Sequence, residues 1–274
     1  MGNYIKLVNF EIQRFWKFLM TLVVFVVVVQ IIGAFVDTSS FLNQAQRTMQ
    51  QEKIAESQYV FNYNVYSLYH FLNSGLFLIS VMFTIAVLII YVFFIWYRDW
   101  FGKSSFIYRL LMLPTERRHI YFAKLTTILL FVFVLLGLQV LLIEVAELII
   151  KSILPAELYA EQGVIFTYSY DVLAILFPQS MLGFLLSYGI GTALVATLFT
   201  AILLERSFHL KGIILAGIYI TLSQAFLFTP ILLDMNTNYF YMSEILSMFV
   251  VTALIIFVVA VFLANYLLKR KINV

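Results

Sequence analysis

A short run, Gly102-Lys103-Ser104, suggests phosphate binding, because these residue types in this order end a phosphate-binding loop. That loop needs a further glycine five residues before Gly102, and Tyr97 stands there inside an apolar stretch. The strand and helix that should flank the loop are missing too, and no polar segment is long enough to fold as an ATPase domain. The run therefore predicts no nucleotide site in this chain.

Histidine and cysteine offer no catalytic or metal site either. His70, His119 and His209 fall in three separate loops, without a His-Glu-x-x-His pattern. Cysteine is absent, which excludes a disulfide framework, a thiolate zinc site and a cysteine nucleophile. We therefore do not expect an enzyme, a metal or cofactor held by this chain, or nucleic-acid binding.

Two carboxylates, Glu144 and Glu147, stand one helical turn apart and share a face at the end of an apolar stretch. Ionised carboxylates are costly in lipid, so such groups face protein or water. Two interpretations stay open. Either the helix emerges into water here, or the pair forms an outer acidic site that senses a proton or a cation.

The rest of the sequence is that of a membrane protein. Its 274 residues are 63% hydrophobic and 11% charged, whereas a soluble domain carries about 25% charged residues. Six stretches of roughly 20 residues lack Asp, Glu, Lys, Arg and His, and each can span a bilayer as a helix. We predict an all-α polytopic membrane protein with a single transmembrane domain over residues 1–274. Its expected spans are about 18–36, 74–97, 125–143, 181–204, 212–233 and 245–268.

The basic residues orient these spans, because Lys and Arg accumulate on the cytoplasmic side of a membrane. All but three of the 17 basic residues fall on the side of both chain ends; the exceptions are Arg47, Lys53 and Lys151. Most of the 14 acidic residues fall on the other side. We therefore expect both the N- and C-termini in the cytoplasm.

Two segments outside the spans have an amphipathic pattern. Residues 1–17 suit an interfacial helix, with Ile5, Val8 and Ile12 on one face. Between the second and third spans, Phe106, Ile107, Leu110 and Leu111 form the apolar face of a short cytoplasmic helix that Pro114 ends. This second helix either lies flat on the lipid or docks on a soluble partner, and docking is the preferred interpretation.

Around this second helix the chain resembles the type-2 ATP-binding-cassette (ABC) permeases. That family shows an acidic residue, a glycine, a Leu-rich helix, a proline, an arginine and a lysine that opens the third span. The matching residues are Arg98-Asp99, Gly102, Tyr108-Arg109-Leu110-Leu111-Met112-Leu113-Pro114-Thr115-Glu116-Arg117-Arg118 and Lys124. The six spans, the surface helix before the first and the basic tail Lys269-Arg270-Lys271 are similar as well. The outer loop at residues 234–244 is short for members that carry large outer domains.

The resemblance implies a permease subunit of an ATP-driven exporter in the plasma membrane of a bacterium. A separate cytoplasmic ABC ATPase, which would hold the ATP and Mg²⁺, is expected to dock on the coupling helix between spans two and three. A second permease, identical or related, would complete the pathway. The expected docking residues are Phe106, Ile107, Arg109, Leu110, Leu111, Leu113, Pro114, Glu116 and Arg117.

The spans carry few polar groups, so the expected cargo is an amphipathic peptide or a lipophilic drug, moved outward. Two other functions remain open. One is an ion-coupled transporter that uses Glu144 and Glu147. The other is a membrane scaffold or sensor whose basic loop recruits a cytoplasmic partner.

Overall fold

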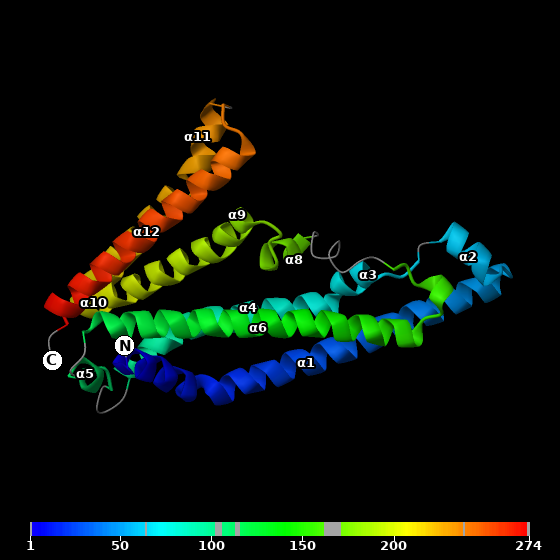
Figure 1. Cartoon of the computed structure of the whole chain (residues 1–274), viewed down its shortest axis with the longest axis horizontal. Helices are drawn as coiled ribbons and strands as arrows, with labels where there is room; N and C mark the ends of the chain where they lie inside the picture. The colour runs from blue at the N-terminus through cyan, green and yellow to red at the C-terminus, as the bar shows by residue number, and fades with distance from the viewer. Residues whose placement is uncertain are drawn as a thin grey trace. The chain divides into compact units, whose positions relative to one another are not determined.

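A computed structural model of the chain describes residues 2–63, 65–101, 106–112, 116–161, 171–237 and 239–272. Within these residues every regular element is helical, and one isolated parallel bridge joins Tyr66 and Tyr159 (Figure 1). This agrees with the predicted all-α class. The elements are α1 (Gly2–Glu52), α2 (Glu56–Asn62), α3 (Leu68–Leu72), α4 (Gly75–Trp100), α5 (Phe106–Leu111), α6 (Arg118–Ile153), η1 (Ala156–Leu158), α8 (Asp171–Leu176), α9 (Met181–Phe184), the π-helix η2 (Leu185–Gly189), α10 (Ile190–Leu227), α11 (Thr229–Thr237) and α12 (Met242–Arg270).

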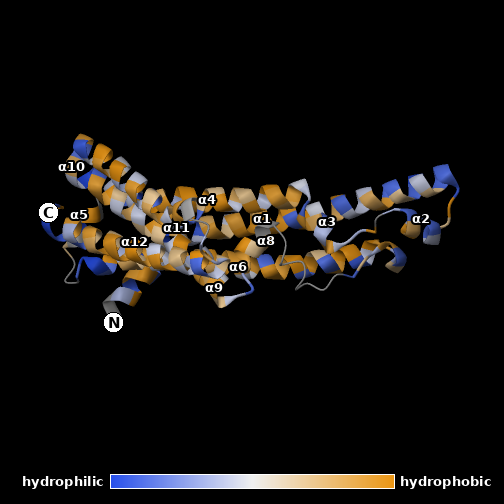
Figure 2. Ribbon diagram, turned by 90° about the horizontal axis from the view of Figure 1, so that it is seen from above, coloured by the Kyte–Doolittle hydropathy of each residue, from blue (hydrophilic) through white to orange (hydrophobic). Residues whose placement is uncertain are grey.

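Five helical stretches of the described chain are long and apolar enough to cross a membrane. They are Tyr4–Glu52, Gly75–Trp100, Arg118–Ile153, Met181–Leu227 and Met242–Arg270. Hydrophobic residues cover most of their length in Figure 2, which supports a multi-pass membrane protein. The number differs from the six predicted spans because residues 181–204 and 212–233 fall largely within one stretch.

That stretch contains a sharp bend. His209 has a φ of 52° and a ψ of −126°, outside the helical range. A Cβ atom built on Gly212 would overlap the carbonyl oxygen of Leu204, eight residues earlier. In a straight helix eight residues advance the chain by about 12 Å. The two halves of α10 therefore fold back against each other at residues 205–211.

Several helix ends differ from the predicted span ends. The helix α1 continues without a break past residues 17 and 36, and α6 continues past residue 143. Hydrophilic residues dominate the end of α1 next to α2 in Figure 2, so this extension is a helix of solvent-exposed composition. The predicted span 212–233 is interrupted at Phe228, where α10 ends before Pro230 in the first turn of α11.

The chain divides into two compact units. Unit 1 comprises Met1–Phe15, Leu88–Leu130 and Ile175–Val274, and unit 2 comprises Trp16–Val87 and Phe131–Ala174. Long helices α1, α4 and α6 each contribute residues to both units. Each unit has its own buried contacts, described separately below.

In unit 2, a buried polar cluster joins α1, α4 and α6. The side-chain amide of Gln30 donates to Ser80 Oγ at 2.9 Å and to Gln139 Oε1 at 3.0 Å, and Gln139 donates back to Gln30 at 3.2 Å. All three side chains are buried in otherwise apolar helices. Hydrogen bonds of this kind hold helices together in lipid, where the hydrophobic effect does not.

Beyond the predicted spans, unit 2 has a second small core. Ala45 on α1, Tyr59 on α2 and Leu158 in η1 are buried together. The backbone N–H of Tyr66 donates to the carbonyl of Leu158 at 3.0 Å, and Ala160 N–H donates to the carbonyl of Tyr66 at 2.9 Å. These contacts pack the end of α1 against α2 and η1 outside the apolar stretches.

In unit 1, α10 and α12 lie side by side (Figure 1). Small residues allow the close approach: Ala193 on α10 and Ala253 on α12 are buried in one cluster. The hydroxyl of Thr200 donates to its own helix at Ala196 and, at 3.0 Å, to the carbonyl of Ala260 on α12. Ala193 and Thr200 therefore lie on the face of α10 that packs against α12.

Three fully buried aromatic side chains join α4, α6 and α10 in unit 1. The ring of Phe199 lies edge-on to Trp96 and Tyr121, with centroids 5.5 and 5.7 Å away. The hydroxyl of Tyr121 also donates to the carbonyl of Ala196 at 3.0 Å. This cluster positions the ends of α4 and α6 that carry the candidate functional site.

Candidate functional site

The short helix α5 follows α4 in unit 1, as the sequence predicted for the coupling helix. Ile107 and Leu110 are 0% and 4% exposed, whereas Arg109 and Met112 are exposed. Ile107 and Leu110, the two residues of the predicted apolar face whose side chains the structure describes, are thus covered by the chain itself. Of the other predicted docking residues, Leu113 and Pro114 lie outside the described residues, and so do the side chains of Phe106 and Leu111.

The sequence predicts that Ile107 and Leu110 contact a soluble partner, because an amphipathic helix beneath a membrane needs a surface for its apolar face. In the structure that surface belongs to the same polypeptide. Among the described side chains of this segment, Arg109, Met112, Glu116 and Arg118 are exposed.

Arg117 ties the segment after α5 to the end of α12. Its Nη1 donates to the carbonyl of Leu268 at 2.5 Å and to the carbonyl of Ile272 at 2.9 Å. The last carbonyls of a helix have no partner within the helix, and a cation there also matches the negative end of the helix dipole. Arg117 is therefore an internal anchor. Its neighbours Glu116 and Arg118 form an exposed ion pair.

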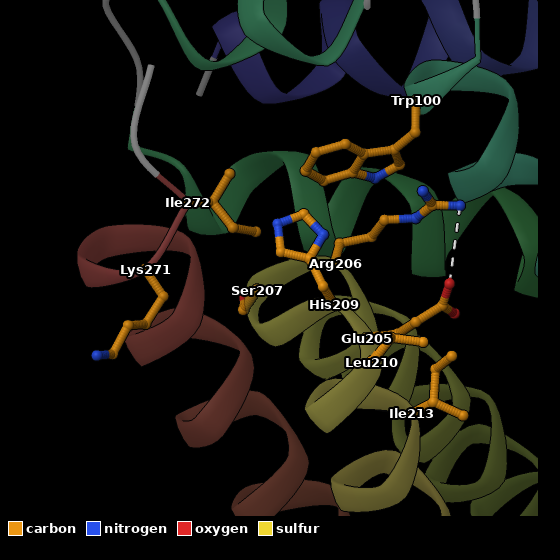
Figure 3. A pocket seen from close by; sticks show the side chains of 9 residues that line it. All are labelled: Trp100, Glu205, Arg206, Ser207, His209, Leu210, Ile213, Lys271 and Ile272. Carbon is orange, nitrogen blue, oxygen red and sulfur yellow. Dashed lines mark ion pairs between the residues drawn. The ribbon is translucent and has the colours of Figure 1, made fainter.

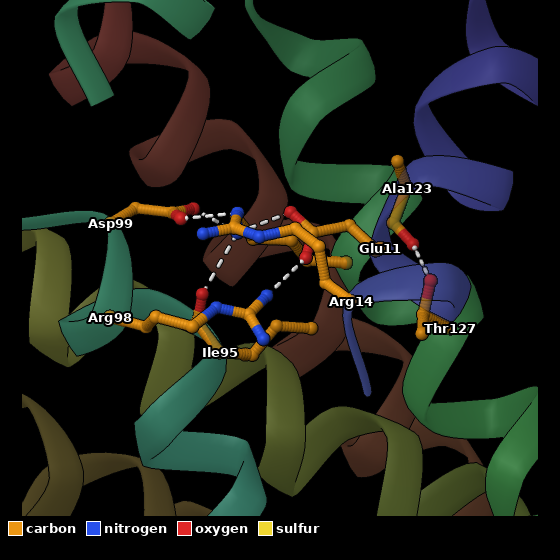
Figure 4. Close-up of polar contacts among 8 residues, drawn as sticks. Glu11, Arg14, Ile95, Arg98, Asp99, Ala123 and Thr127 are labelled. Carbon is orange, nitrogen blue, oxygen red and sulfur yellow. Dashed lines mark hydrogen bonds and ion pairs between the residues drawn. The ribbon is translucent and has the colours of Figure 1, made fainter. Parts of the chain in front are cut away.

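A buried ion network lies at the same end of unit 1 (Figure 4). Lys124 on α6 uses its three N–H groups on Glu11 Oε1 at 2.7 Å, Asp99 Oδ2 at 2.5 Å and the carbonyl of Ile95 at 2.8 Å. Its ammonium also lies 5.2 Å from the centroid of the Trp96 ring. All donors of this lysine are satisfied without water.

Two arginines complete the network. Arg98 Nη2 donates to the second oxygen of Glu11 at 2.8 Å, and Arg14 Nη1 donates to the second oxygen of Asp99 at 2.7 Å. Each carboxylate therefore meets two cations, one per oxygen, and the five charges sum to +1. Such fully paired buried charges fix the geometry of the helices that carry them.

The N-terminal end of α1 is arranged to place Glu11 in this network. Leu7, Glu11, Phe15 and Leu19 recur every four residues and are all buried. Phe15 stacks on Tyr91 of α4 with ring centroids 3.5 Å apart. The buried face therefore differs from the predicted apolar face, and Ile5 is exposed.

Sequence reasoning missed Glu11 and Arg14 as parts of the site. It had placed Arg98, Asp99 and Lys124 in a family motif, and the structure brings these three together. The sequence does contain a signal for Glu11. It is the one charged residue in a series spaced four residues apart, whose other members are Leu7, Phe15 and Leu19.

The two candidate carboxylates in unit 2 have different surroundings. Glu144 is exposed, whereas Glu147 pairs with Lys151 at 3.0 Å and accepts a hydrogen bond from the Tyr159 hydroxyl at 3.2 Å. Burial and the nearby charge of Glu147 raise the pKa of Tyr159 to about 12. Lys151 also pairs with Glu161 at 3.1 Å. The structure therefore places Glu147 in a small ion-pair cluster that does not include Glu144.

Within the described parts of the chain, no group of three or more His, Asp or Glu side chains could hold a metal ion. The ion network has no nucleophile next to a base, and each of its charges has a partner. The arrangement can hold helices together and transmit a displacement between them.

Comparison with known proteins gives no relative: no protein-family model, no curated protein and no solved structure matches this chain.

Proposed function

We propose that this chain is the membrane-spanning permease subunit of an ATP-driven ABC exporter. One observation carries the proposal. Arg98, Asp99, Arg117 and Lys124, on which the resemblance to type-2 permeases rests, hold the segment around α5 against α1, α6 and α12 within unit 1. A short helix held in this way can pass a push from a soluble partner to the long helices.

The proposed topology has six membrane crossings with both chain ends in the cytoplasm. The bend at His209 supports it, because residues 181–204 and 212–233 then cross as two helices joined by a short turn. Arg206 and Lys211 fall in that turn, which agrees with the accumulation of basic residues on the cytoplasmic side.

The proposed partner of α5 is a cytoplasmic ABC ATPase, which supplies ATP and Mg²⁺. Because Ile107 and Leu110 are covered, the contact falls on the accessible residues Arg109, Met112 and Glu116. A second permease, identical or related, forms the pathway together with this chain in the plasma membrane. The proposed cargo remains an amphipathic peptide or a lipophilic drug, since the predicted spans carry no ionisable residue.

Purification of the tagged full chain from native membranes in mild detergent tests the proposal. We expect a co-purifying soluble protein to be labelled by a photoreactive ATP analogue. Its ATP hydrolysis should rise when a cationic amphipathic peptide is added, and should not change with sucrose. Transport that follows an ion gradient without ATP would instead favour the ion-coupled alternative, and a co-purifying partner without ATP labelling would favour the scaffold.

A further inference from the structure

A pocket of about 560 Å³ opens at the bend of α10 in unit 1, and no step of the proposed transport cycle uses it (Figure 3). This volume falls in the range of about 300–1,000 Å³ that small-molecule sites occupy. Trp100 at the end of α4, the bend residues of α10 and the residues that follow α12 line the pocket. The lining residues are Trp100, Glu205, Arg206, Ser207, His209, Leu210, Ile213, Lys271 and Ile272.

Two residues that line the pocket carry a buried donor without an acceptor. Trp100 Nε1 and Arg206 Nε are both buried and make no hydrogen bond in the described structure. Both groups donate only, so no rotation of the side chain can turn them into acceptors. Leaving such a donor unpaired destabilises the folded chain. An oxygen-rich ligand in the pocket would remove this destabilisation.

The guanidinium of Arg206 is held in place by aromatic rings. It lies 4.8 Å from the ring centroid of Tyr97, 5.8 Å from that of Trp100 and 5.7 Å from that of Phe101. Within the described residues, the ion pair of Arg206 is with Glu205 and is long, at 3.8 Å. Glu205 also accepts a hydrogen bond from the Tyr97 hydroxyl. The cation is thus oriented while one edge remains unpaired.

The charge of the pocket is positive. Its lining residues include two cations, Arg206 and Lys271, and a single carboxylate, Glu205. Figure 3 shows the His209 ring between Ile272 and Arg206, whereas the Lys271 ammonium points away toward the rim. Lys271 therefore adds long-range attraction, and Arg206, His209 and Trp100 supply the donors near the centre.

Apolar side chains border the same pocket. Leu210 and Ile213 are 81% and 56% exposed, and Ile213 begins the apolar half of α10 that returns from the bend. A site with phosphate-type donors beside exposed aliphatic groups matches an amphiphile at headgroup depth. Basic pockets between transmembrane helices on the cytoplasmic side bind anionic headgroups in this way.

We propose that the pocket at the α10 bend binds the phosphate headgroup of an anionic phospholipid from the adjoining leaflet. The phosphate oxygens accept from Arg206 Nε, Trp100 Nε1 and the His209 ring, and the acyl chains leave along Leu210 and Ile213. Binding there fixes the turn between the two halves of α10. The proposal does not depend on the transport function, only on the position of this turn at the membrane surface.

Native mass spectrometry of the purified full chain tests the site, with dioleoyl phosphatidylglycerol and dioleoyl phosphatidylcholine as competing lipids. We expect the wild type to retain phosphatidylglycerol selectively. Arg206→Gln should lower the retained amount roughly tenfold, because a charged hydrogen bond is lost. Trp100→Phe should lower it by a smaller factor, because the ring stays and only one neutral donor is removed. The matched controls Arg47→Gln and Trp16→Phe change exposed residues elsewhere and should retain as much lipid as the wild type.

Three results would overturn the proposal. One is equal retention by Arg206→Gln and Arg47→Gln. Another is equal retention of the two lipids by the wild type, a measurement that holds even if a variant fails to fold. The third is displacement of the lipid by millimolar inorganic phosphate, which would identify a site for free phosphate and not for a lipid.

Discussion

Lys124 donates a hydrogen bond from Nζ to Oε1 of Glu11 at 2.7 Å, although 113 residues separate the two in the sequence. Both side chains are almost fully buried, and the same ammonium also pairs with Asp99 of α4. No solvent is at hand to replace a lost partner. Each buried charge of the network is therefore stabilised by the others, and removing one destabilises its partners.

Lys124→Met tests this dependence. The substitution leaves Glu11 paired with Arg98 and Asp99 paired with Arg14, but one oxygen of each buried carboxylate loses its donor, which costs about 1–3 kcal/mol for each group. We expect a markedly lower melting temperature of the detergent-purified protein, followed by intrinsic fluorescence. The control is Lys151→Met, which removes a partly exposed ion pair with Glu147 and should change little. An unchanged melting temperature for Lys124→Met would show that the network does not support the fold.

Gly212→Ala tests the bend of α10. The added methyl group would overlap the backbone of Leu204 and Glu205, and backbone cannot move aside as a side chain does. We expect a loss of stability. Gly217→Ala, on the same helix with open space around the new methyl group, should be neutral or stabilising by up to about 1 kcal/mol. The melting temperatures of both variants test this expectation. Equal melting temperatures would contradict the close approach of Gly212 to the backbone of Leu204 and Glu205.

Cysteine labelling tests the six-span topology, because the chain has no cysteine of its own. An impermeant thiol reagent added to intact cells should label Gln50→Cys and Met235→Cys. It should leave Met112→Cys and Lys211→Cys unlabelled until the membrane is opened. All four positions are exposed, so burial does not explain a missing signal. Labelling of Met112→Cys from outside would reverse the orientation and remove the docking surface from the cytoplasm.

Substitutions at Leu110 and Met112 distinguish an effect on the folding of α5 from an effect on the docking of the ATPase. Leu110→Asp would bury an unpaired carboxylate, so we expect little folded protein in the membrane. Met112→Asp places the same group on an exposed position, so we expect normal folding but loss of the co-purifying ATPase. Size-exclusion chromatography reports folding, and the ATP-labelled band reports docking. Met235→Asp is the control for an exposed methionine outside the proposed surface, and equal loss of the ATPase in both variants would contradict the assignment.

Hydropathy predicted the long helices well where apolar stretches end at clear signals. The predicted span 245–268 lies inside α12 (Met242–Arg270), and 74–97 nearly matches α4 (Gly75–Trp100). The ends of α1 and α6 could not be predicted in this way. Between residues 37 and 52 the sequence turns polar but contains no Gly or Pro, so nothing in it stops a helix. Polarity marks the edge of the lipid, and a helix is free to continue past it.

The candidate site was predicted only in part. The motif located α5, Arg98, Asp99 and Lys124, because these residues lie close together in the sequence. The missing information was three-dimensional: which residues cover Ile107 and Leu110, and which distant side chains pair with Lys124. Glu11 is distant in sequence from its partners, and a charge pair of this kind leaves only a weak trace in local periodicity.

Arg117 binds the carbonyls of Leu268 and Ile272, which follow it by 151 and 155 residues. The ribosome thus synthesises the segment around α5, including Arg117, long before it synthesises the two carbonyl groups that Arg117 binds. Until α12 has been synthesised and has packed against α10, these two carbonyls are missing and the segment lacks its attachment. A nascent or truncated chain therefore cannot present the finished surface around α5. A partner that recognises this surface selects, without any further factor, molecules whose last long helix is already in place.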